Sequence, residues 1–341
     1  MILFCSDYQE GAHPEILEKL AAINLTQNPG YGTDDHCQKA AELIRAKCGC
    51  PDADVHFLVG GTQTNTTVIS AALRPHQGVL CAHTGHINVH ETGAIEAAGH
   101  KVLGVMSPDG KITAAQVERE VTLQADFEHT VKPGMVYISF PTELGTLYTL
   151  AELTALRKVC DRHRLYLFLD GARLGYGLCG EGNDVTLADI ARLCDVFYIG
   201  GTKLGALFGE AVVINHPALK PDFRYFIKQR GGMLAKGWLL GVQFQVLFED
   251  DRYFVIAQHA QRLAMLLRDE LRRLNIPFLI DSPTNQQFPI LPDNVIEKLG
   301  PRYTLCFQEK TDDTHTAVRI CTSWATREED VLALLKDLGD A

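Results

Sequence analysis

The chain has 341 residues, 46% of them hydrophobic, which is enough for one large domain and a smaller one around a sizeable core. Its formal net charge of -10 and the lack of a dense basic run argue against a nucleic-acid partner and favour small-molecule ligands. No apolar run reaches the roughly 18 residues that span a membrane, so we expect a cytoplasmic protein without a membrane partner. The ten cysteines lack regular spacing and are expected to be reduced, with the closest pair, Cys48 and Cys50, structural.

Apolar runs of strand length alternate with helical patterns from Val55 to Ile214, after a polar first segment. This alternation predicts an open α/β sheet that is covered by helices on both faces. The predicted strands are 55–59, 79–81, 101–105, 135–140, 165–169, 196–199 and 211–214. The predicted helices are 63–73, 87–98, 151–162 and 186–193, the last of which opens with a Thr186-x-x-Asp189 cap.

The pattern changes from Leu234 onward, where longer amphipathic helices precede short strands. We expect helices at 234–248 and 252–274 and strands at 278–280, 287–291, 304–307 and 317–320. A last helix is predicted to begin at Thr326, whose Thr-x-x-Glu329 pattern is a capping box. The chain therefore divides into an N-terminal segment, residues 1–14, a large domain, residues 15–233, and a small α/β domain, residues 234–341.

In open α/β sheets ligands bind beyond the carboxyl ends of the strands, so the residues that follow each strand matter most. The first predicted strand leads into Gly60-Gly-Thr-Gln-Thr-Asn65 and a helix. Free backbone N–H groups around Gly61, the Thr62 hydroxyl and the helix dipole are together typical of a phosphate site. The alternative is an ordinary N-cap by Thr62. There is no Walker lysine, so a nucleoside triphosphate is not expected.

Two further strand ends carry charged residues. Asp170, in Asp170-Gly-Ala-Arg173, either forms a salt bridge with Arg173 or holds a protonated heterocyclic nitrogen while Arg173 binds a carboxylate. Lys203 follows the next strand, where it is either a solvated turn residue or a buried amine that attacks a carbonyl. A phosphate site, an aspartate and a lysine at one sheet edge are the three anchors that pyridoxal phosphate needs.

A histidine-rich segment allows two interpretations. His86 stands at the start of a predicted helix, where it could stack on a cofactor and transfer a proton, or simply cap the helix. His83, His86 and His90 also allow a metal-dependent hydrolase, although no HExxH pattern supports it. A GxGxxG match at Gly175–Gly180 does not pass directly into a helix, which argues against a nicotinamide cofactor.

Taken together, these residues resemble the threonine aldolase family of pyridoxal-phosphate enzymes, over nearly the whole chain. The motifs that carry the resemblance are Ser6-Asp7, Tyr31-Gly32, Gly61-Thr62, His86-Ile with Glu91-Thr-Gly-Ala94, Asp170-Gly-Ala-Arg173, Lys203 and Val318-Arg319-Ile320. The resemblance implies the aspartate aminotransferase-like fold (fold type I), with a mainly parallel seven-stranded sheet in the large domain. It also implies a homodimer or homotetramer with shared sites, in which the loop through Tyr31 could serve a neighbouring subunit.

The resemblance further implies that β-hydroxy-α-amino acids such as L-threonine and L-allo-threonine are cleaved to glycine and an aldehyde. Lys203 would form the Schiff base with pyridoxal phosphate, Asp170 would keep the ring nitrogen protonated, and His86 would stack on the ring. The cofactor-binding residues would be Gly61, Thr62, His86, Asp170, Arg173 and Lys203. The substrate-binding residues would be Ser6, Tyr31, Arg173 and Arg319, with Ser6 from the N-terminal segment, and no metal is expected.

Two departures from the family pattern leave questions open. Family members carry Thr-His-Asn where this chain has Pro141-Thr-Glu-Leu-Gly145, so either Glu143 or a water near His86 would handle the β-hydroxyl proton. The family's phosphate-binding arginine near the position of Leu234 is absent, and Lys236 is either its substitute or a solvated residue. A pyridoxal-phosphate β-eliminating lyase or racemase therefore remains an alternative.

Overall fold

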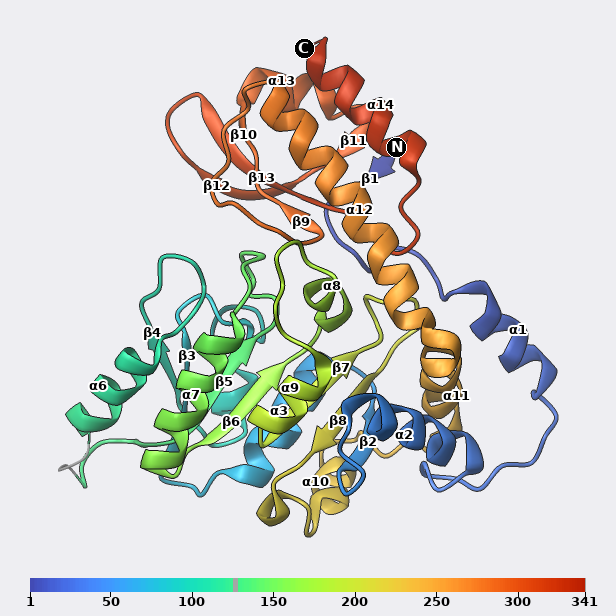
Figure 1. Ribbon diagram of the computed structural model, residues 1–341, viewed down its shortest axis with the longest axis vertical. Coiled ribbons are helices and arrows are strands. Elements are labelled where there is room, and N and C mark those ends of the chain that lie inside the picture. The colour runs from blue at the N-terminus through green and yellow to red at the C-terminus, as the bar shows by residue number, and fades with distance from the viewer. Residues whose placement is uncertain (125–127, 341) are drawn as a thin grey trace.

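Figure 1 shows the computed structural model, which describes residues 1–124 and 128–340. The predicted large sheet is confirmed and has seven strands. In spatial order they are β2 (Asp54–Leu58), β8 (Glu210–Ile214), β7 (Val196–Gly200), β6 (Tyr166–Asp170), β5 (Lys132–Ser139), β3 (Gln77–Ala82) and β4 (Val102–Val105). Only β8 runs antiparallel to its neighbours in this sheet, so the carboxyl ends of the other strands point toward one edge.

Helices cover both faces of the sheet, because successive side chains of a buried strand point to opposite sides. Along β5, Met135 and Tyr137 enter one core, whereas Val136 and Ile138 enter the other. The Val136 face is covered by α1 (Pro14–Ala22), α2 (Asp35–Cys48), α6 (Ala114–Gln124), α7 (Leu150–His163), α9 (Leu187–Leu193) and α11 (Trp238–Phe248). The Tyr137 face is covered by α3 (Gly61–Ala72), α4 (His86–Val89), α5 (Ala94–Ala97) and α10 (Phe223–Gln229).

A smaller α/β unit follows α11 and lies beyond the carboxyl edge of the large sheet (Figure 1). Its elements are α12 (Arg252–Arg273), β9 (Gln286–Gln287), β10 (Ile290–Pro292), α13 (Asp293–Leu299), β11 (Tyr303–Thr304), β12 (Cys306–Lys310), β13 (His315–Cys321) and α14 (Glu328–Gly339). The strand order is β10-β13-β12, all antiparallel, and β9 also pairs with β13. The short elements α8 (Leu174–Leu178), η1 (Pro217–Leu219) and η2 (Glu249–Asp251) complete the structure together with β1 (Ile2–Leu3).

One predicted helix, 87–98, is divided into two short helices in the structure. A continuous helix over 87–98 is wrong, since α4 ends at Val89 and α5 begins at Ala94. Thr92 and Gly93 separate the two helices, and their φ angles of 53° and 69° lie in the left-handed region that a helix cannot contain. As a result Glu91 leaves the helical path and is buried.

The caps and ends of other helices differ in part from expectation. The Thr186–Asp189 cap of α9 is confirmed as a full capping box. The box predicted at Thr326 is wrong, because the Thr326 hydroxyl accepts a hydrogen bond from the Ser323 N–H at 2.7 Å and α14 begins two residues later. In addition, α11 begins at Trp238 rather than 234, and the strand expected at 278–280 is reduced to a single bridge from Phe278 to Pro289. The polar first segment holds α1 and α2, which the pattern did not predict.

The first residues of the chain connect the smaller unit to the large sheet. β1 pairs with β11, and Phe4 packs in the core of the smaller unit. Asp7 is fully buried and accepts hydrogen bonds from Arg173 Nε at 2.7 Å, from Arg173 Nη2 at 2.9 Å and from Asn285 Nδ2 at 2.9 Å. Burial raises the pKa of Asp7, but the charges of Arg173 and Lys203 outweigh burial and hold this pKa below its usual value. Among the described residues no helix is long and apolar enough to cross a membrane.

We expect Asp7→Asn to lower the free energy of unfolding by about 3 kcal/mol, because the variant leaves a buried guanidinium without its counter-charge. Because the pKa of native Asp7 is lowered, its contribution is complete above the ordinary carboxyl pKa of about 4 and is lost as the pH falls further. Urea unfolding of both proteins between pH 7 and pH 3 measures this difference. The control is Asp54→Asn, which affects a partly exposed pair with Lys220 (3.8 Å) and should change stability by less than about 1 kcal/mol.

A second prediction concerns the capping box of α9. Thr186→Ala removes the hydroxyl that accepts the Asp189 N–H at 3.1 Å, so unfolding should require about 1 kcal/mol less free energy. Thr122→Ala is the matched control, since Thr122 lies on an exposed face within α6 and caps nothing. An unchanged urea midpoint for Thr186→Ala would contradict the role of the cap.

Candidate active site

The carboxylate of Asp170 lies at the end of β6, the strand that leads into α8 between the sheet and the smaller unit (Figure 1). Asp170 is only 4% exposed. Its Oδ1 accepts the Ala172 N–H at 3.0 Å, and its Oδ2 accepts from Asn65 Nδ2 at 3.2 Å and from the Tyr137 hydroxyl. The alternative of a salt bridge to Arg173 is not the one that forms, because Arg173 pairs with Asp7. These neutral donors leave the carboxylate free to serve as the counter-charge of a bound cation.

Lys203 follows β7, the neighbour of β6, in the connection to β8. Its Nζ lies 5.8 Å from the centre of the Tyr8 ring. Burial lowers the pKa of Lys203 and the Arg173 charge lowers it further, although the Asp7, Asp170 and Glu210 charges oppose this change. Burial also raises the pKa of Glu210 to about 8. A lysine whose pKa is lowered has a larger fraction of neutral amine, the form that attacks carbonyl groups.

His86, at the start of α4, is connected to Asp170 by a short hydrogen-bonded path. His86 Nδ1 lies 2.8 Å from Glu91 Oε1, and the same oxygen accepts from Asn65 Nδ2 at 2.7 Å. Burial lowers the pKa of His86, but the bond to Glu91 and the charge of Asp170 outweigh burial, so this pKa lies above its usual value. Glu91 and Asn65 therefore fix the orientation of the imidazole ring relative to Asp170.

The N-terminus of α3 supplies the anion site of this sheet edge. Gly60 is the N-cap and the cap has no side-chain hydrogen bond, so the alternative of an N-cap by Thr62 is wrong. Gly61 opens the helix and the Thr62 side chain is exposed at its first turn. The Thr64 N–H is the first to bond within the helix, at 3.0 Å to the Gly60 carbonyl. The N–H groups before it point to the place where a helix attracts a phosphate.

The side chains expected to bind a substrate carboxylate come from three elements. Arg319 lies on β13, where Nη2 donates to the Cys5 carbonyl at 3.0 Å and Nε is buried without a partner. Arg173 uses Nε and Nη2 for Asp7, which leaves Nη1. Ser6 lies between Cys5 and Asp7 and is partly exposed. Burial lowers the pKa of His90, and the charges of His86, Arg319, Lys203 and Arg173 lower it further.

Two residues considered for the site, Tyr31 and Lys236, lie in other parts of the structure. Tyr31 is 49% exposed, and its carbonyl accepts from Arg224 Nη2 at 3.0 Å. It lines a separate pocket of about 210 Å³ together with Arg224 and Met233. Lys236 is exposed in the turn before α11, not on the helix itself. Within one chain, therefore, neither residue is grouped with Lys203 and Asp170.

The two rival sites find little support in the geometry. His83 Nδ1 accepts the Ser107 N–H at 3.1 Å and His86 is committed to Glu91. In the ranges 1–124 and 128–340, no group of three metal-binding side chains is arranged around a common point. Gly175 of the GxGxxG match lies inside α8, where a side chain would collide with Leu204 and Tyr253. Close helix packing explains this glycine, so no nucleotide contact is needed.

Several polar side chains of this region were not found from the sequence. Tyr137 belongs to an apolar strand and looked like a core residue, while Glu91 opens a resemblance motif but fell inside a predicted helix and was given no role. Asn65 was treated only as the end of a glycine-rich turn, and Glu210 stood just before the strand predicted at 211–214. A signal was present for Asp7, which stands next to Ser6 in a resemblance motif, but its pairing with Arg173 required the structure.

Taken as a set, these residues fit pyridoxal phosphate. The amine of Lys203, the buried carboxylate of Asp170 and the open N-terminus of α3 match the aldehyde, the ring nitrogen and the phosphate of that cofactor. The donor chemistry would suit a phosphate and a pyridinium, whereas a metal ion would require a denser set of acidic or imidazole ligands.

Comparison with known proteins places the chain in a family. The family model described as beta-eliminating lyase matches residues 4–293. A low specificity L-threonine aldolase from Pseudomonas aeruginosa is 30% identical over 98% of this chain and 96% of its own length. A solved threonine aldolase structure from Leishmania major is 48% identical, with a TM-score of 0.98 over 100% of this chain and 99% of that one. A mutant aspartate aminotransferase from Thermus thermophilus, 17% identical, has a TM-score of 0.74 over 100% of this chain and 91% of that chain and shares the fold. The chain therefore belongs to the beta-eliminating lyase family.

Proposed function

We propose that this chain is a pyridoxal-phosphate-dependent aldehyde-lyase that cleaves β-hydroxy-α-amino acids such as L-threonine to glycine and an aldehyde. The observation that carries the proposal is the single sheet edge that holds Lys203, Asp170 and the open N-terminus of α3. The threonine aldolases among its relatives, at 30% and 48% identity over nearly the whole chain, support this substrate class.

Bound pyridoxal phosphate supplies an aldehyde that attaches to amines and a ring that accepts electrons from a breaking bond. Lys203 would hold the aldehyde carbon, because its lowered pKa favours the nucleophilic amine. Asp170 would keep a proton on the ring nitrogen, and its three donors prevent the carboxylate from turning away. His86 would lie against the ring face, with its orientation set by Glu91. Gly61 and Thr62 would hold the phosphate at the start of α3.

We assign the substrate carboxylate to the neighbourhood of Arg319, Arg173 and Ser6. Arg319 is the principal candidate, because its buried Nε has no partner in the chain and an unpaired buried donor is unfavourable. Arg173 would add Nη1, since Asp7 occupies its other donors. A carboxylate fixed here holds the Cα–Cβ bond in one orientation, and such positioning lowers the barrier to cleavage.

The isolated position of Tyr31 fits an assembly of several copies. We propose a homodimer or homotetramer in which the exposed Tyr31 loop reaches the site of a neighbouring copy. All ten cysteines are free, which is typical of a reducing compartment, and we propose a cytoplasmic location.

Lys203→Ala should fold normally but lose covalent cofactor. We expect the purified wild type to show a visible absorption band that borohydride removes. Peptide mapping should then find the reduced cofactor, which serves as the label, on the peptide that contains Lys203. The variant should show neither the band nor the label, and its threonine cleavage should fall by at least about a thousandfold, because the attachment amine is gone. Full activity in the variant would refute the assigned role.

The products separate aldol cleavage from β-elimination. Incubation of the wild-type holoenzyme with L-threonine and with L-serine, followed by amino-acid and aldehyde assays, should give glycine and an aldehyde. Ammonia and a keto acid as the main products would instead support the β-eliminating alternative, and interconversion of enantiomers without cleavage would support a racemase.

A further inference from the structure

The turn that follows β5 places a second carboxylate beside His86. Glu143 Oε1 accepts the Ser139 hydroxyl at 2.6 Å and the His86 N–H at 2.9 Å. Both bonds end on the same oxygen, so neither of them occupies Oε2. The Glu143 side chain is partly exposed rather than fully enclosed. One oxygen of Glu143 thus anchors the side chain, while the other is available to an incoming group.

Electrostatics place Glu143 in the same neighbourhood as the candidate site. Burial raises the pKa of Glu143, and the charge of Asp170 adds to this increase, while the bonds to Ser139 and His86 oppose it. A carboxyl group whose pKa rises toward neutrality exchanges protons more readily at physiological pH than an ordinary surface carboxylate.

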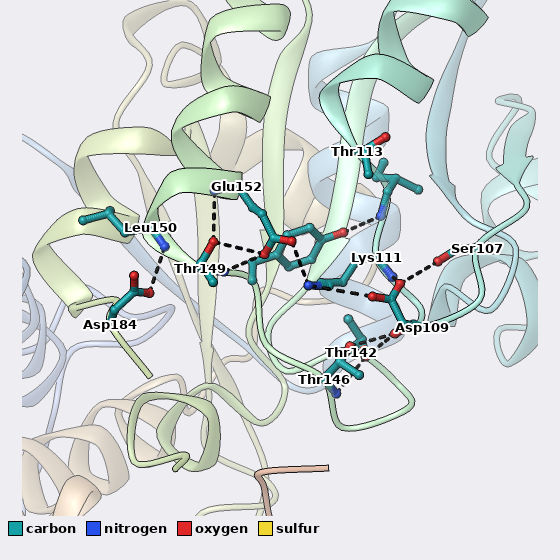
Figure 2. Close-up of polar contacts among 12 residues, drawn as sticks. Ser107, Asp109, Lys111, Thr113, Thr142, Thr146, Thr149, Leu150, Glu152 and Asp184 are labelled. Atoms are coloured by element: carbon teal, nitrogen blue, oxygen red, sulfur yellow. Dashed lines mark hydrogen bonds and ion pairs between the residues drawn. The ribbon is translucent and has the colours of Figure 1, made fainter. Parts of the chain in front are cut away.

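The turn itself is held firmly on its β4 side by the polar cluster in Figure 2. The hydroxyls of Thr142 and Thr146 lie 2.7 Å apart, and Thr146 Oγ1 donates to the Asp109 carbonyl at 2.7 Å. The Thr142 N–H also donates to the Thr146 carbonyl at 3.0 Å, which closes the turn around Glu143. The two threonines therefore fasten the ends of the turn to the backbone of one neighbouring loop.

The loop that contains Asp109 is itself held by further polar contacts. Asp109 Oδ1 accepts the Ser107 hydroxyl and the Lys111 N–H, each at 3.1 Å, and Lys111 Nζ donates to Glu152 Oε1 at 2.8 Å (Figure 2). Glu152 belongs to the capping box of α7, so the loop is tied to the first turn of a core helix.

The opposite side of the turn contacts the smaller unit. The Gly145 carbonyl accepts the hydroxyls of Ser282 and Thr284 at 3.1 and 3.2 Å, and both side chains are fully buried. Gly145 has a φ of 75°, and an added Cβ would collide with Ser282. The direct contacts of the turn with Asp109, Ser282 and Thr284 use hydroxyl and backbone groups, so they do not depend on a carboxylate at position 143.

We propose that Glu143 is a catalytic residue whose Oε2 takes the proton of the substrate's β-hydroxyl group during cleavage. This inference rests on the proposed function. As the O–H bond breaks, its electron pair forms the aldehyde C=O bond, and the Cα–Cβ pair stays with the glycine half. That half then takes up a proton at Cα from solvent, and Glu143 releases the β-hydroxyl proton to solvent, so the protons balance and the carboxylate is regenerated. In the reverse direction Glu143 returns its proton to the new hydroxyl group.

Glu143→Gln tests this role, because a glutamine oxygen can still accept from Ser139 and His86 but cannot take a proton. Three measurements on the holoenzyme are compared with the wild type: the cofactor absorption band with borohydride labelling, glycine formation from L-threonine, and exchange of the glycine Cα hydrogen in D₂O by NMR. Glycine has no β-carbon and no β-hydroxyl, so its exchange reports attachment to the cofactor and proton transfer at Cα but not the proton transfer assigned to Glu143.

We expect the cofactor signals and the melting temperature to be retained, glycine exchange to stay within about threefold, and threonine cleavage to fall by about 10²-fold or more. Glu143→Asp should recover part of the cleavage, because it keeps a carboxylate. Cleavage within about threefold of the wild type, or exchange that falls in parallel with cleavage, would overturn the proposal. If the wild type itself forms no glycine from threonine, the proposed function fails first and this inference fails with it.

Thr146→Val tests the support of the turn, since it removes two hydroxyl contacts with little change of shape. A less firmly held Glu143 should reduce kcat for threonine about three- to tenfold, with KM and glycine exchange nearly unchanged, because effective proton transfer requires precise positioning. Thr113→Val is the matched control, because it also removes a threonine hydroxyl, one that bonds Gln116 on an exposed surface outside the turn. Equal effects of the two variants would contradict the support role.

Discussion

The buried carboxylate of Asp170 is the constraint on which the polar architecture of the site depends. A carboxylate away from water must be compensated by donors or by a cation. Asn65, Tyr137 and the Ala172 N–H provide the donors, and they come from α3, β5 and the turn after β6. Because they supply no positive charge, Asp170 keeps its electrostatic attraction for a cationic ring. The need to compensate this carboxylate therefore brings residues from three separate elements together at Asp170.

A chain of hydrogen bonds continues from Asp170 across this sheet edge. Asn65 Nδ2 donates to both Asp170 and Glu91, Glu91 Oε1 meets His86 Nδ1, and the His86 N–H reaches Glu143. Each member is oriented by the next, so a displacement of one would be felt by the others. The cations are arranged separately: Asp7 neutralises Arg173, which limits how strongly that guanidinium lowers the pKa of Lys203. Burial lowers the pKa of Lys203, whereas the charges of Asp170 and Glu210 raise it, and the Arg173 charge that lowers it further is neutralised by Asp7.

The sequence was sufficient to predict the position of those site residues that directly follow a strand. Asp170 and Lys203 follow consecutive apolar runs, and the carboxyl ends of parallel strands meet at one edge, so their proximity could be predicted. Glu91 could not be placed, because the left-handed backbone at Thr92 breaks a pattern that reads as continuous helix. Asp7 and Arg173 are separated by 166 residues, and nothing local indicates that they pair. Tyr137 fits the alternating pattern of a strand residue in the core, and its hydroxyl finds a partner in Asp170, at the end of the adjacent strand β6.

The turn around Glu143 shows why the smaller unit matters for chemistry at the edge of the large sheet. One end of the turn is fastened to a loop of the large sheet through Asp109, and its Gly145 carbonyl to Ser282 and Thr284 of the smaller unit. Ser282 and Thr284 are fully buried, so the packing of the two units helps to hold the turn in its position. Arg319 on β13 comes from the same smaller unit. The packing that positions Arg319 therefore also positions the turn of Glu143, so the two groups proposed for carboxylate binding and proton transfer depend on one interface.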